Sequence, residues 1–362
     1  MSTTFDRRTF ISRTALAAGG LAVAGGAGEF LAGCGSSSGG SSTATTKAGG
    51  KADYGKLAFQ LSWIKNTEFA GQYIADTKGY YTAAGFSGVN LLAGGPTVQQ
   101  DAVVAAGKAF VGISSPDITS AAILKGAPLI IVGALFQKNP FCIMSLKSNP
   151  IATPQDMIGK KIGVQAVNEP VWNAFLKANK IDASKIKKVT VQFNPQPLVA
   201  KEVDGWFSFI TNEPNLLKTQ GVDTTTFLLN DHNYPLVSQV YVVKTDALTA
   251  SRDKLKALLV ADIKGWHDSI KDPSAGPELV VTKYGKDQKL DKAEQTLEST
   301  AQNALIVSDD TKANGIMTVT SKLIDESIAT LALDGTTIDA KKLFDMSVIE
   351  EVYSENPDLK AY

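Results

Sequence analysis

The sequence predicts an α/β protein with two lobes, a hinge between them and a helical C-terminal region, and three observations support this. Strand-like runs alternate with helical patterns from residue 57 to residue 243, which is typical of βαβ units and mainly parallel sheets. After Thr245 the pattern is almost wholly helical. The 329 residues after residue 33 also exceed the roughly 250–300 residues that one hydrophobic core serves.

The first lobe is expected at residues 55–139 plus 242–362, and the second at 140–241. Short apolar and β-branched runs give the expected strands, at 57–61, 89–92, 109–113, 128–134, 161–164, 189–193, 203–207, 227–229 and 239–243. Helical periodicity gives the expected helices, at 69–81, 98–106, 118–125, 169–179, 214–220, 252–270, 279–284, 292–305, 311–334 and 339–343. The chain should cross between the lobes near 137–140 and 238–241. Carboxyl ends of the strands should then face one cleft, which hinged closure would seal.

The N-terminus carries the pattern Asp6–Ile11 with two arginines, an Ala- and Gly-rich apolar segment, and then Leu31-Ala32-Gly33-Cys34. This order resembles a twin-arginine export signal that ends in a lipobox. The resemblance implies that residues 1–33 are removed, that Cys34 is lipidated, and that the protein is anchored to the membrane outside the cytoplasm. The apolar segment is too short for a membrane span of about 20 residues. An uncleaved N-terminal anchor stays open as the alternative.

Charge and cysteine content narrow the classes of function. Residues 34–54, after the signal, are rich in Gly, Ser and Thr and indicate a flexible linker. From residue 34 onward, 33 basic residues balance 34 acidic ones, so no nucleic-acid partner is expected. Only Cys142 remains besides Cys34; it lies in the apolar run 140–144 and is interpreted as a small buried side chain. Arg252 is the single arginine after residue 33, which disfavours an anion held by an arginine clamp, although lysines or helix N-termini stay possible.

Three separated motifs carry a family resemblance between residues 57 and 245. They are the run from Trp63 to Tyr81, the run 159–165, and Val203–Pro214. They resemble the solute-binding proteins of ABC importers, and within these the branch that captures pyrimidine precursors of thiamine. The resemblance implies a two-lobed periplasmic-binding-protein fold of the hinged type, a small-molecule ligand, and an ABC permease with its ATPase as partner. We expect a monomer.

In the first lobe, Trp63 and Asn66 follow the first strand, where an indole stacks on a flat ring and a carboxamide forms hydrogen bonds. The alternative is that Trp63 caps the core and Asn66 caps a helix. Phe69 and Tyr73 share a helix face and serve the ligand or the core.

Polar groups follow the next strands. Ser114, Ser115 and Asp117 end a strand and begin a helix, so they offer ligand contacts or ordinary helix caps. Gly95 allows close backbone approach or simply forms a turn.

In the second lobe, the candidate ligand contacts are Gln165, Trp172, Trp206, Asn212 and Glu213. Gln165 ends a strand, Trp172 lies in the next helix, and Trp206 precedes the Asn212-Glu213-Pro214 motif. Glu213 either complements the dipole of a helix first turn or accepts hydrogen bonds from an amine or a ring N–H group. We expect the second role.

The sequence predicts no enzyme. Eukaryotic relatives of the resembled family make the thiamine pyrimidine from one of their own histidines, which stands where this chain has Phe69, and need a cysteine-rich motif that is absent here. The two histidines, His232 and His267, do not form a metal site or a catalytic triad, and no phosphate loop is present. We therefore expect no catalytic residue, no metal and no cofactor.

The expected function is extracytoplasmic capture of a small flat nitrogen heterocycle, such as a thiamine pyrimidine precursor or riboflavin, for an ABC importer. The absence of an arginine clamp favours a neutral or weakly basic ligand over an anion. Two alternatives stay open: a solute-binding protein for sulfonates or nitrate, and an exported sensor module.

Overall fold

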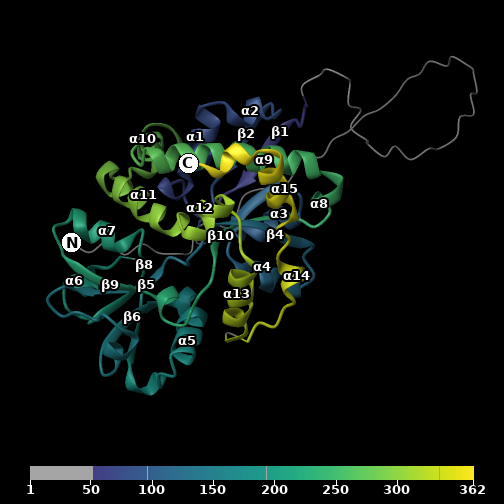
Figure 1. The fold of residues 1–362 in the computed structure, drawn as a ribbon. Coiled ribbons are helices and arrows are strands. Elements are labelled where there is room, and N and C mark those ends of the chain that lie inside the picture. Colours follow the sequence, from purple (N-terminus) through teal and green to yellow (C-terminus); the bar gives the residue numbers. More distant parts are fainter. Residues whose placement is uncertain (1–51, 96, 193, 334) are drawn as a thin grey trace, which may run out of the picture. The chain divides into compact units, whose positions relative to one another are not determined.

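Ten strands, among the residues that the structure describes, form two separate five-stranded sheets in the computed structural model (Figure 1). The structure describes residues 52–95, 97–192, 194–333 and 335–362, which belong to one unit from Gly49 to Tyr362. The predicted signal segment 1–33, the predicted lipidation residue Cys34 and the linker up to residue 51 lie outside the described residues, as does Pro96.

The first sheet has the strand order β2-β1-β3-β10-β4. Its strands are β1 (Lys56–Gln60), β2 (Gly88–Leu92), β3 (Val111–Ser114), β4 (Leu129–Phe136) and β10 (Ser238–Lys244). β1 runs parallel to β2 and β3, whereas β10 runs antiparallel to both β3 and β4. Four strands therefore share one direction and β10 opposes them.

The second sheet repeats this plan in the order β7-β6-β8-β5-β9. Its strands are β5 (Phe141–Leu146), β6 (Lys161–Gln165), β7 (Lys187–Val191), β8 (Gly205–Phe209) and β9 (Thr224–Leu228). β6 is parallel to β7 and β8, and β5 is antiparallel to β8 and β9. The prediction of mainly parallel strands is thus corrected to two mixed sheets. Each of the nine predicted strands overlaps an observed one, and β5 falls on the apolar run 140–144 that was interpreted only as buried.

The reversed strands explain how the two sheets are connected. β5 begins at Phe141 opposite Phe209, the last residue of β8, and β10 begins at Ser238 opposite Phe136, the last residue of β4. Both connections, 137–140 and 229–237, therefore lie at the carboxyl edges of the sheets they join. The second connection precedes the residues 238–241 that the sequence suggested, because those residues already pair within β10.

The two connections are also bonded to each other. The side-chain amide of Asn139 donates to the carbonyl oxygen of Tyr234 at 2.9 Å, and Lys138 forms an ion pair with Asp231 at 2.8 Å. The two connecting segments therefore lie side by side.

Helices near the first sheet begin with a 3₁₀ turn, η1 (Thr67–Phe69), and continue with α1 (Ala70–Thr77), α2 (Tyr80–Ala83), α3 (Gln100–Ala105) and α4 (Pro116–Leu124). The predicted helix 69–81 is broken between α1 and α2. Gly79 causes the break, because its φ of +72° is left-handed and ends a helix at little steric cost.

Helices near the second sheet agree with the prediction to within one or two residues. They are α5 (Glu169–Ala178), α6 (Gln196–Val199) and α7 (Glu213–Thr219), with 3₁₀ turns η2 (Pro154–Met157), η3 (Ala166–Asn168), η4 (Ala183–Lys185) and η5 (Leu229–Asp231). α6 alone was not predicted.

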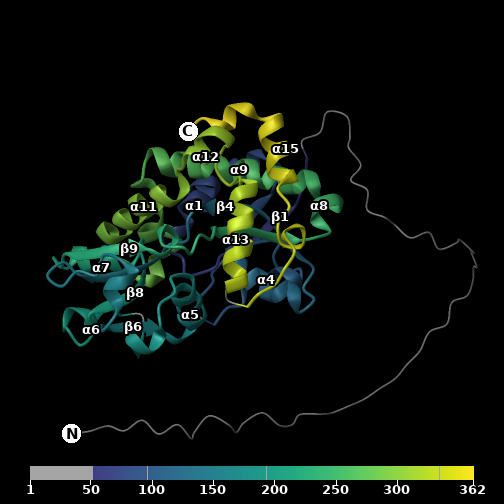
Figure 2. The same cartoon turned by 60° about the horizontal axis from the view of Figure 1, so that its bottom comes forward.

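The C-terminal region is helical, as predicted, but divided more often. It contains α8 (Ala247–Ala250), α9 (Arg252–Lys271), α10 (Ala275–Leu279), a π-helical turn η6 (Val280–Tyr284), η7 (Lys286–Gln288), α11 (Lys292–Ile306), α12 (Asp309–Asn314), α13 (Ser321–Leu333), α14 (Ala340–Leu343), α15 (Ser347–Glu355) and η8 (Pro357–Lys360). The predicted helix 311–334 is two helices, because Gly315 ends α12 with a φ of +100°. α15 was not predicted. α13 contacts both α4 and α5, between which it stands in Figure 2.

α1 and α9 approach each other closely through two glycines. A Cβ atom on Gly265 would lie 2.1 Å from the carbonyl oxygen of Gly71, and one on Gly71 would lie 2.4 Å from the ring of Trp266. Gly71 belongs to the first family motif. The close packing of α1 on α9 explains a glycine at this position without any ligand contact.

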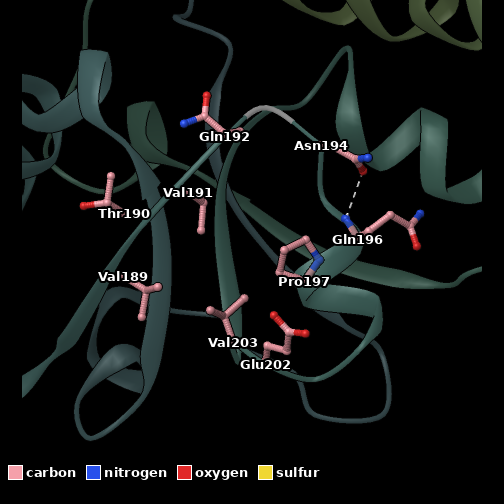
Figure 3. A pocket seen from close by; sticks show the side chains of 9 residues that line it. All are labelled: Val189, Thr190, Val191, Gln192, Asn194, Gln196, Pro197, Glu202 and Val203. Carbon is pink, nitrogen blue, oxygen red and sulfur yellow. Dashed lines mark hydrogen bonds between the residues drawn. The ribbon is translucent and has the colours of Figure 1, made fainter. Parts of the chain in front are cut away.

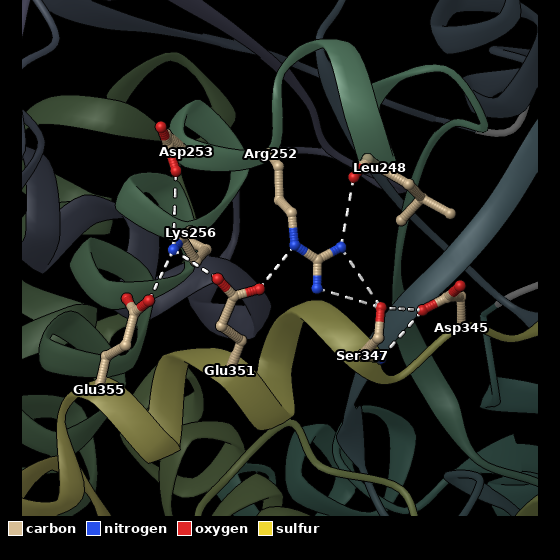
Figure 4. A network of polar contacts seen from close by, with 8 residues as sticks. All are labelled: Leu248, Arg252, Asp253, Lys256, Asp345, Ser347, Glu351 and Glu355. Atoms are coloured by element: carbon tan, nitrogen blue, oxygen red, sulfur yellow. Dashed lines mark hydrogen bonds and ion pairs between the residues drawn. The ribbon is translucent and has the colours of Figure 1, made fainter.

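Ion pairs fasten α9 to α15 (Figure 4). Arg252 Nε lies 2.6 Å from Glu351, and Lys256 Nζ lies 2.7 Å from Glu351 and 2.8 Å from Glu355. Each pair is partly exposed, so we expect each to contribute about 0–1 kcal/mol. The single arginine after residue 33 is therefore engaged in helix packing.

Among the described helices, none combines the length and the apolar character that crossing a membrane requires.

Trp206 lies in a small core of the second sheet. It has no exposed surface and clusters with Met144, Leu198, Val203 and Leu217. Trp206, which the sequence indicated as a candidate ligand contact, therefore has no exposed ring face to offer a ligand. We therefore expect Trp206 to stabilise the packing of the second sheet.

Trp206→Ala should lower the free energy of unfolding by about 3–5 kcal/mol, because it leaves a large cavity. Thermal denaturation measures the loss. The half-buried Trp63 is the matched control, and Trp63→Ala should cost less stability. A Trp206→Ala protein that unfolds like the wild type would contradict the core assignment.

Candidate ligand-binding site

Several connecting segments meet at the carboxyl edge of the first sheet. Gln60, the last residue of β1, donates its side-chain amide to the carbonyl oxygens of Leu92, the last residue of β2, at 3.4 Å and of Ala93 at 3.2 Å. β3 ends at Ser114, which pairs with Val240 near the start of β10. The segments 61–69, 93–95, 114–117 and 237–239 therefore share one edge, where open α/β sheets bind ligands.

Asn66, soon after β1, is joined to helix α11 by buried hydrogen bonds. Its Nδ2 donates to Oε1 of Glu298 at 2.9 Å, and Gln295 Nε2 donates to Oε2 of the same carboxylate at 2.9 Å. The amide of Thr67 donates to Gln295 at 2.8 Å, and Gln302 donates to the carbonyl oxygen of Thr67 at 3.1 Å. A polar stripe of α11 thus holds the segment that follows β1.

Glu68 is the second carboxylate of this edge, and it was not singled out from the sequence. Gln239 donates its side-chain amide to Glu68 across to the start of β10. Burial raises the pKa of Glu68 to about 7, although hydrogen bonds from Asn66 and Gln239 partly oppose the shift. Gln239 has a φ of +51°, and a non-glycine residue in this region costs of order 1–3 kcal/mol. Strain of this kind is typical of functional sites.

Two buried polar atoms have no hydrogen-bond partner among the described residues: the hydroxyl of Tyr73 and Oδ1 of Asn66, whose other side-chain atom bonds to Glu298. Tyr73 is fully buried and stacks on Tyr284 with ring centroids 4.4 Å apart. Burial raises the pKa of Tyr73 well above its usual value, and the charges of Glu68 and Glu298 raise it further. An unpaired buried polar atom costs about 1–3 kcal/mol, so ligand groups that bond to it gain affinity.

The second sheet contributes Glu213, in the first turn of α7. Its Oε2 accepts hydrogen bonds from the Ser208 hydroxyl at 2.7 Å and the Phe209 amide at 3.0 Å. Burial raises the pKa of Glu213, and the charge of Glu294 on α11 adds to the increase. Asn212 stands at the N-cap position but does not cap the helix with its side chain, which accepts from Thr211 at 2.9 Å.

We call Glu68, Glu213, Glu294 and Glu298 the carboxylate group. Burial raises the pKa of Glu298 well above its usual value, and the charges of the other three raise it further. Burial likewise raises the pKa of Glu294. Within the described part of the chain, no lysine or arginine forms an ion pair with any of the four. The group therefore offers hydrogen-bonding carboxyl groups without a counter-ion, and burial favours their protonated forms.

The predicted polar residues after β3 form a separate cluster. Ser115 donates its hydroxyl to Asp117 and does not cap α4. Ser114 is buried beside Asp101, whose pKa is raised by burial and lowered in part by Ser114 and Thr119. Gly95 has a φ of +148°, which a side chain would strain.

Three of the other predicted residues have their observed places away from the carboxylate group. Phe69 and Trp172 are buried in the main core, against which the half-buried Trp63 packs. Gln165 is also buried, and it donates to the carbonyl oxygen of Phe207 at 2.9 Å and accepts from Asn168 at 2.9 Å. Of the predicted set, the structure thus brings Asn66, Tyr73 and Glu213 to the group.

Sequence reasoning missed Glu68, Gln239 and the polar residues of α11. A signal for α11 was present, because Gln295, Glu298, Ser299 and Gln302 recur at helical spacing and all four are buried. A buried polar stripe of this kind predicts a binding or packing role. Glu68 lies inside the first motif, but the motif alone does not indicate that it is a site residue.

Two hollows lie elsewhere. One of about 600 Å³, at β7 and α6, is lined by Val189, Thr190, Val191, Gln192, Asn194, Gln196, Pro197, Glu202 and Val203 (Figure 3). Another of about 520 Å³ lies between residues 314–321 and α15. Neither contains a member of the carboxylate group, and the carboxylate of the first, Glu202, belongs to an exposed residue. We therefore place the candidate site at the carboxylate group. The described residues contain no cluster of His, Cys, Asp or Glu suited to a metal ion.

Comparison with solved structures identifies the fold. The aliphatic sulphonate binding protein SsuA of Escherichia coli aligns with a TM-score of 0.63 at 15% identity, over 80% of this chain and 92% of that protein. The periplasmic sulfonate-binding protein SsuA of Methylobacillus flagellatus, named as part of an ABC transporter, aligns with a TM-score of 0.58 at 15% identity, over 84% and 95%. The chain has the periplasmic-binding-protein fold, which confirms the predicted fold class.

Sequence comparison identifies the family. The riboflavin-binding protein RibY of Chloroflexus aurantiacus is 26% identical over 230 residues, which are 62% of this chain and 65% of RibY. The 4-amino-5-hydroxymethyl-2-methylpyrimidine phosphate synthase of Legionella pneumophila is 24% identical over 149 residues, 41% of this chain and 47% of the synthase. The chain thus spans less than two thirds of these relatives. The profile described as "NMT1/THI5 like" matches residues 66–276, more than half of the chain, and the protein belongs to the NMT1/THI5-like family.

Proposed function

We propose that this solute binder of the periplasmic-binding-protein type serves an ABC importer outside the cytoplasm and captures a small flat nitrogen heterocycle with N–H donors. The carboxylate group, together with Oδ1 of Asn66 and the hydroxyl of Tyr73, carries this proposal. These groups accept hydrogen bonds, as an exocyclic amine and a ring N–H require. RibY, named for a flat nitrogen heterocycle, supports the same ligand class.

Binding would involve both sheets. Asn66, Glu68 and Tyr73 belong to segments near the first sheet, whereas Glu213 begins α7 beside the second. The connections 137–140 and 229–237 would act as the hinge between two lobes, since they are the only two passages of the described chain between the sheets. Trp63, near Asn66 in the chain, would supply a ring face for stacking.

A sulfonate or nitrate ligand is the weaker proposal, although the fold is shared with sulfonate-binding proteins. An oxyanion needs cationic or N–H donors, and the candidate site presents carboxylates instead. Arg252 is paired with Glu351 on α15.

We propose no catalytic activity, even though one relative is named a synthase. Phe69 stands where the histidine-consuming relatives have their reacting histidine. His267 is buried and stacks on Tyr362 with ring centroids 5.1 Å apart, and His232 contacts the Phe227 ring, so neither joins the candidate site.

Glu68→Gln should weaken binding by at least about tenfold, because a hydrogen bond to a charged group contributes about 1.5–3 kcal/mol. Calorimetric titration with 4-amino-5-hydroxymethyl-2-methylpyrimidine, riboflavin, taurine and nitrate measures the effect. Glu278→Gln, which removes an exposed carboxylate paired with Lys292, is the control and should bind normally. Tight binding of taurine or nitrate that Glu68→Gln leaves unchanged would overturn the ligand class.

The stability of the ligand-free protein should fall as the pH rises from 6.5 to 8.5. The folded-state pKa of Glu68 is raised from 4.5 to about 7, so its ionisation destabilises the fold as the pH passes through 7. Burial lowers the pKa of His267 to about 4, so its neutral form stabilises the fold. That stability is lost only as the pH falls below about 6.5, which lies outside the range of this test. Urea denaturation at several pH values should show a shallower fall for Glu68→Gln than for the wild type. Equal slopes would contradict a titrating Glu68.

Cys34→Ala should release the protein from the membrane fraction or leave an uncleaved precursor. The reason is that the lipid anchor would be attached to the thiol of this residue. Membrane fractionation and metabolic labelling with a radioactive fatty acid measure the change. Unchanged fractionation together with an unchanged lipid label would reject the anchor and favour an uncleaved N-terminal segment.

A further inference from the structure

The carboxylate group joins elements that belong to different sheets. Glu213 begins α7, beside the second sheet, and α7 packs against α11, which carries Glu294 and Glu298 (Figure 1). Glu68 approaches from the segment after β1. Like charges thus face each other wherever α7 rests on α11.

Among the described residues, no lysine or arginine forms an ion pair with Glu294. Gln295 donates its side-chain amide to Glu294 at 2.6 Å. Lys292, two residues before Glu294 on the same helix, is paired with Glu278 of α10. The titratable groups that interact with the carboxylate group from its own and the adjoining elements are Asp291 before α11, the hydroxyl of Tyr73 in α1 and the buried thiol of Cys142 in β5. None of these groups is positive.

Buried unpaired atoms indicate a ligand here independently of the charges. Tyr73 is fully buried and Asn66 is 5% exposed, yet the Tyr73 hydroxyl and Asn66 Oδ1 have no hydrogen-bond partner in the part of the chain that the structure describes. The Tyr73 hydroxyl lies in the field of Glu68 and Glu298, and Asn66 bonds to Glu298 through its other side-chain atom. A group with N–H donors at this place would satisfy Oδ1 of Asn66 and face the carboxylates.

We propose that the ligand occupies this site as a cation, and that its positive charge is what allows α7 to close on α11. A heterocyclic base that takes up a proton in the site, or a compound with a fixed positive charge, meets the requirement. In the absence of such a ligand, protons that bind to the carboxylates neutralise them and likewise allow α7 to close on α11. The inference rests on the proposed function and narrows its ligand from a donor-bearing ring to a cationic one.

The test measures the closing of α7 without any ligand. Lys218 on α7 and Lys264 on α9 are exposed, and Lys218→Cys with Lys264→Cys allows spin labelling of the full chain in a Cys34→Ala background. Cys142 is buried and stays unlabelled. Double electron–electron resonance should show the short distance gaining population as the pH falls from 8 to 5. Glu294→Gln should move the midpoint upward by about one pH unit, because it removes one like charge.

Glu278→Gln is the matched control, since it removes an exposed carboxylate next to α11 that Lys292 neutralises. It should leave the midpoint unchanged. A distance distribution that ignores pH, or a Glu294→Gln midpoint equal to that of Glu278→Gln, would overturn the inference while leaving the proposed function intact.

A second arm adds probes at pH 8. Thiamine, a fixed cation that carries an aminopyrimidine ring, should shorten the distance and release protons, which calorimetry in buffers of different ionisation enthalpy counts. Riboflavin, which is neutral, should shorten the distance between the two labels only if the complex takes up protons on binding. Shortening by riboflavin without proton uptake would refute the cation requirement and support the proposed function. If neither thiamine nor riboflavin binds but the distance still responds to pH, the proposed ligand class is wrong. The inference that neutralising the carboxylate group allows α7 to close on α11 would then still hold.

Discussion

The buried bonds of Glu298 are the interaction on which the candidate site depends. This carboxylate is 1% exposed and accepts from Asn66 and from Gln295, which in turn accepts from the amide of Thr67. An ionised carboxylate in such a place is costly unless hydrogen bonds satisfy it, and its pKa rises accordingly. Removing one partner would leave the other groups unpaired, so the segment after β1 and helix α11 hold each other in place.

The chain topology brings that segment together with α7. Because β5 and β10 run against the other strands of their sheets, both connections leave and arrive at carboxyl edges. The loops that follow parallel strands lie at the same edges. The hinge proposed above and the candidate site are therefore products of the same two strand reversals, and a sheet with all strands parallel would separate them.

Much of the fold follows from the sequence, and the differences have physical causes. Apolar runs and glycine stops predict the order of strands and helices because burial and φ preferences act locally. The burial of Trp206 was missed because both faces of a sheet covered by helices are apolar, so the pattern of β8 does not tell which side chain approaches a ligand. The division of 311–334 at Gly315 was missed because its helical period continues across the glycine. Glu298 was missed because its partner Asn66 lies 232 residues away, and only the fold brings them together.

Fold and ligand are decided by different residues in this protein. Its structural likeness to sulfonate-binding proteins, at 15% identity, concerns the arrangement of sheets and helices. It does not indicate which side chains stand at the carboxyl edges of the sheets. At the proposed site, the carboxyl groups disfavour an oxyanion: placed beside Glu68, Glu213, Glu294 and Glu298, it would repel carboxylates whose pKa values are already raised. A base would instead relieve the repulsion and supply the donors that Asn66 and the carboxylates accept. The proposed ligand therefore differs in charge from the sulfonates for which these structural neighbours are named, although the fold is shared.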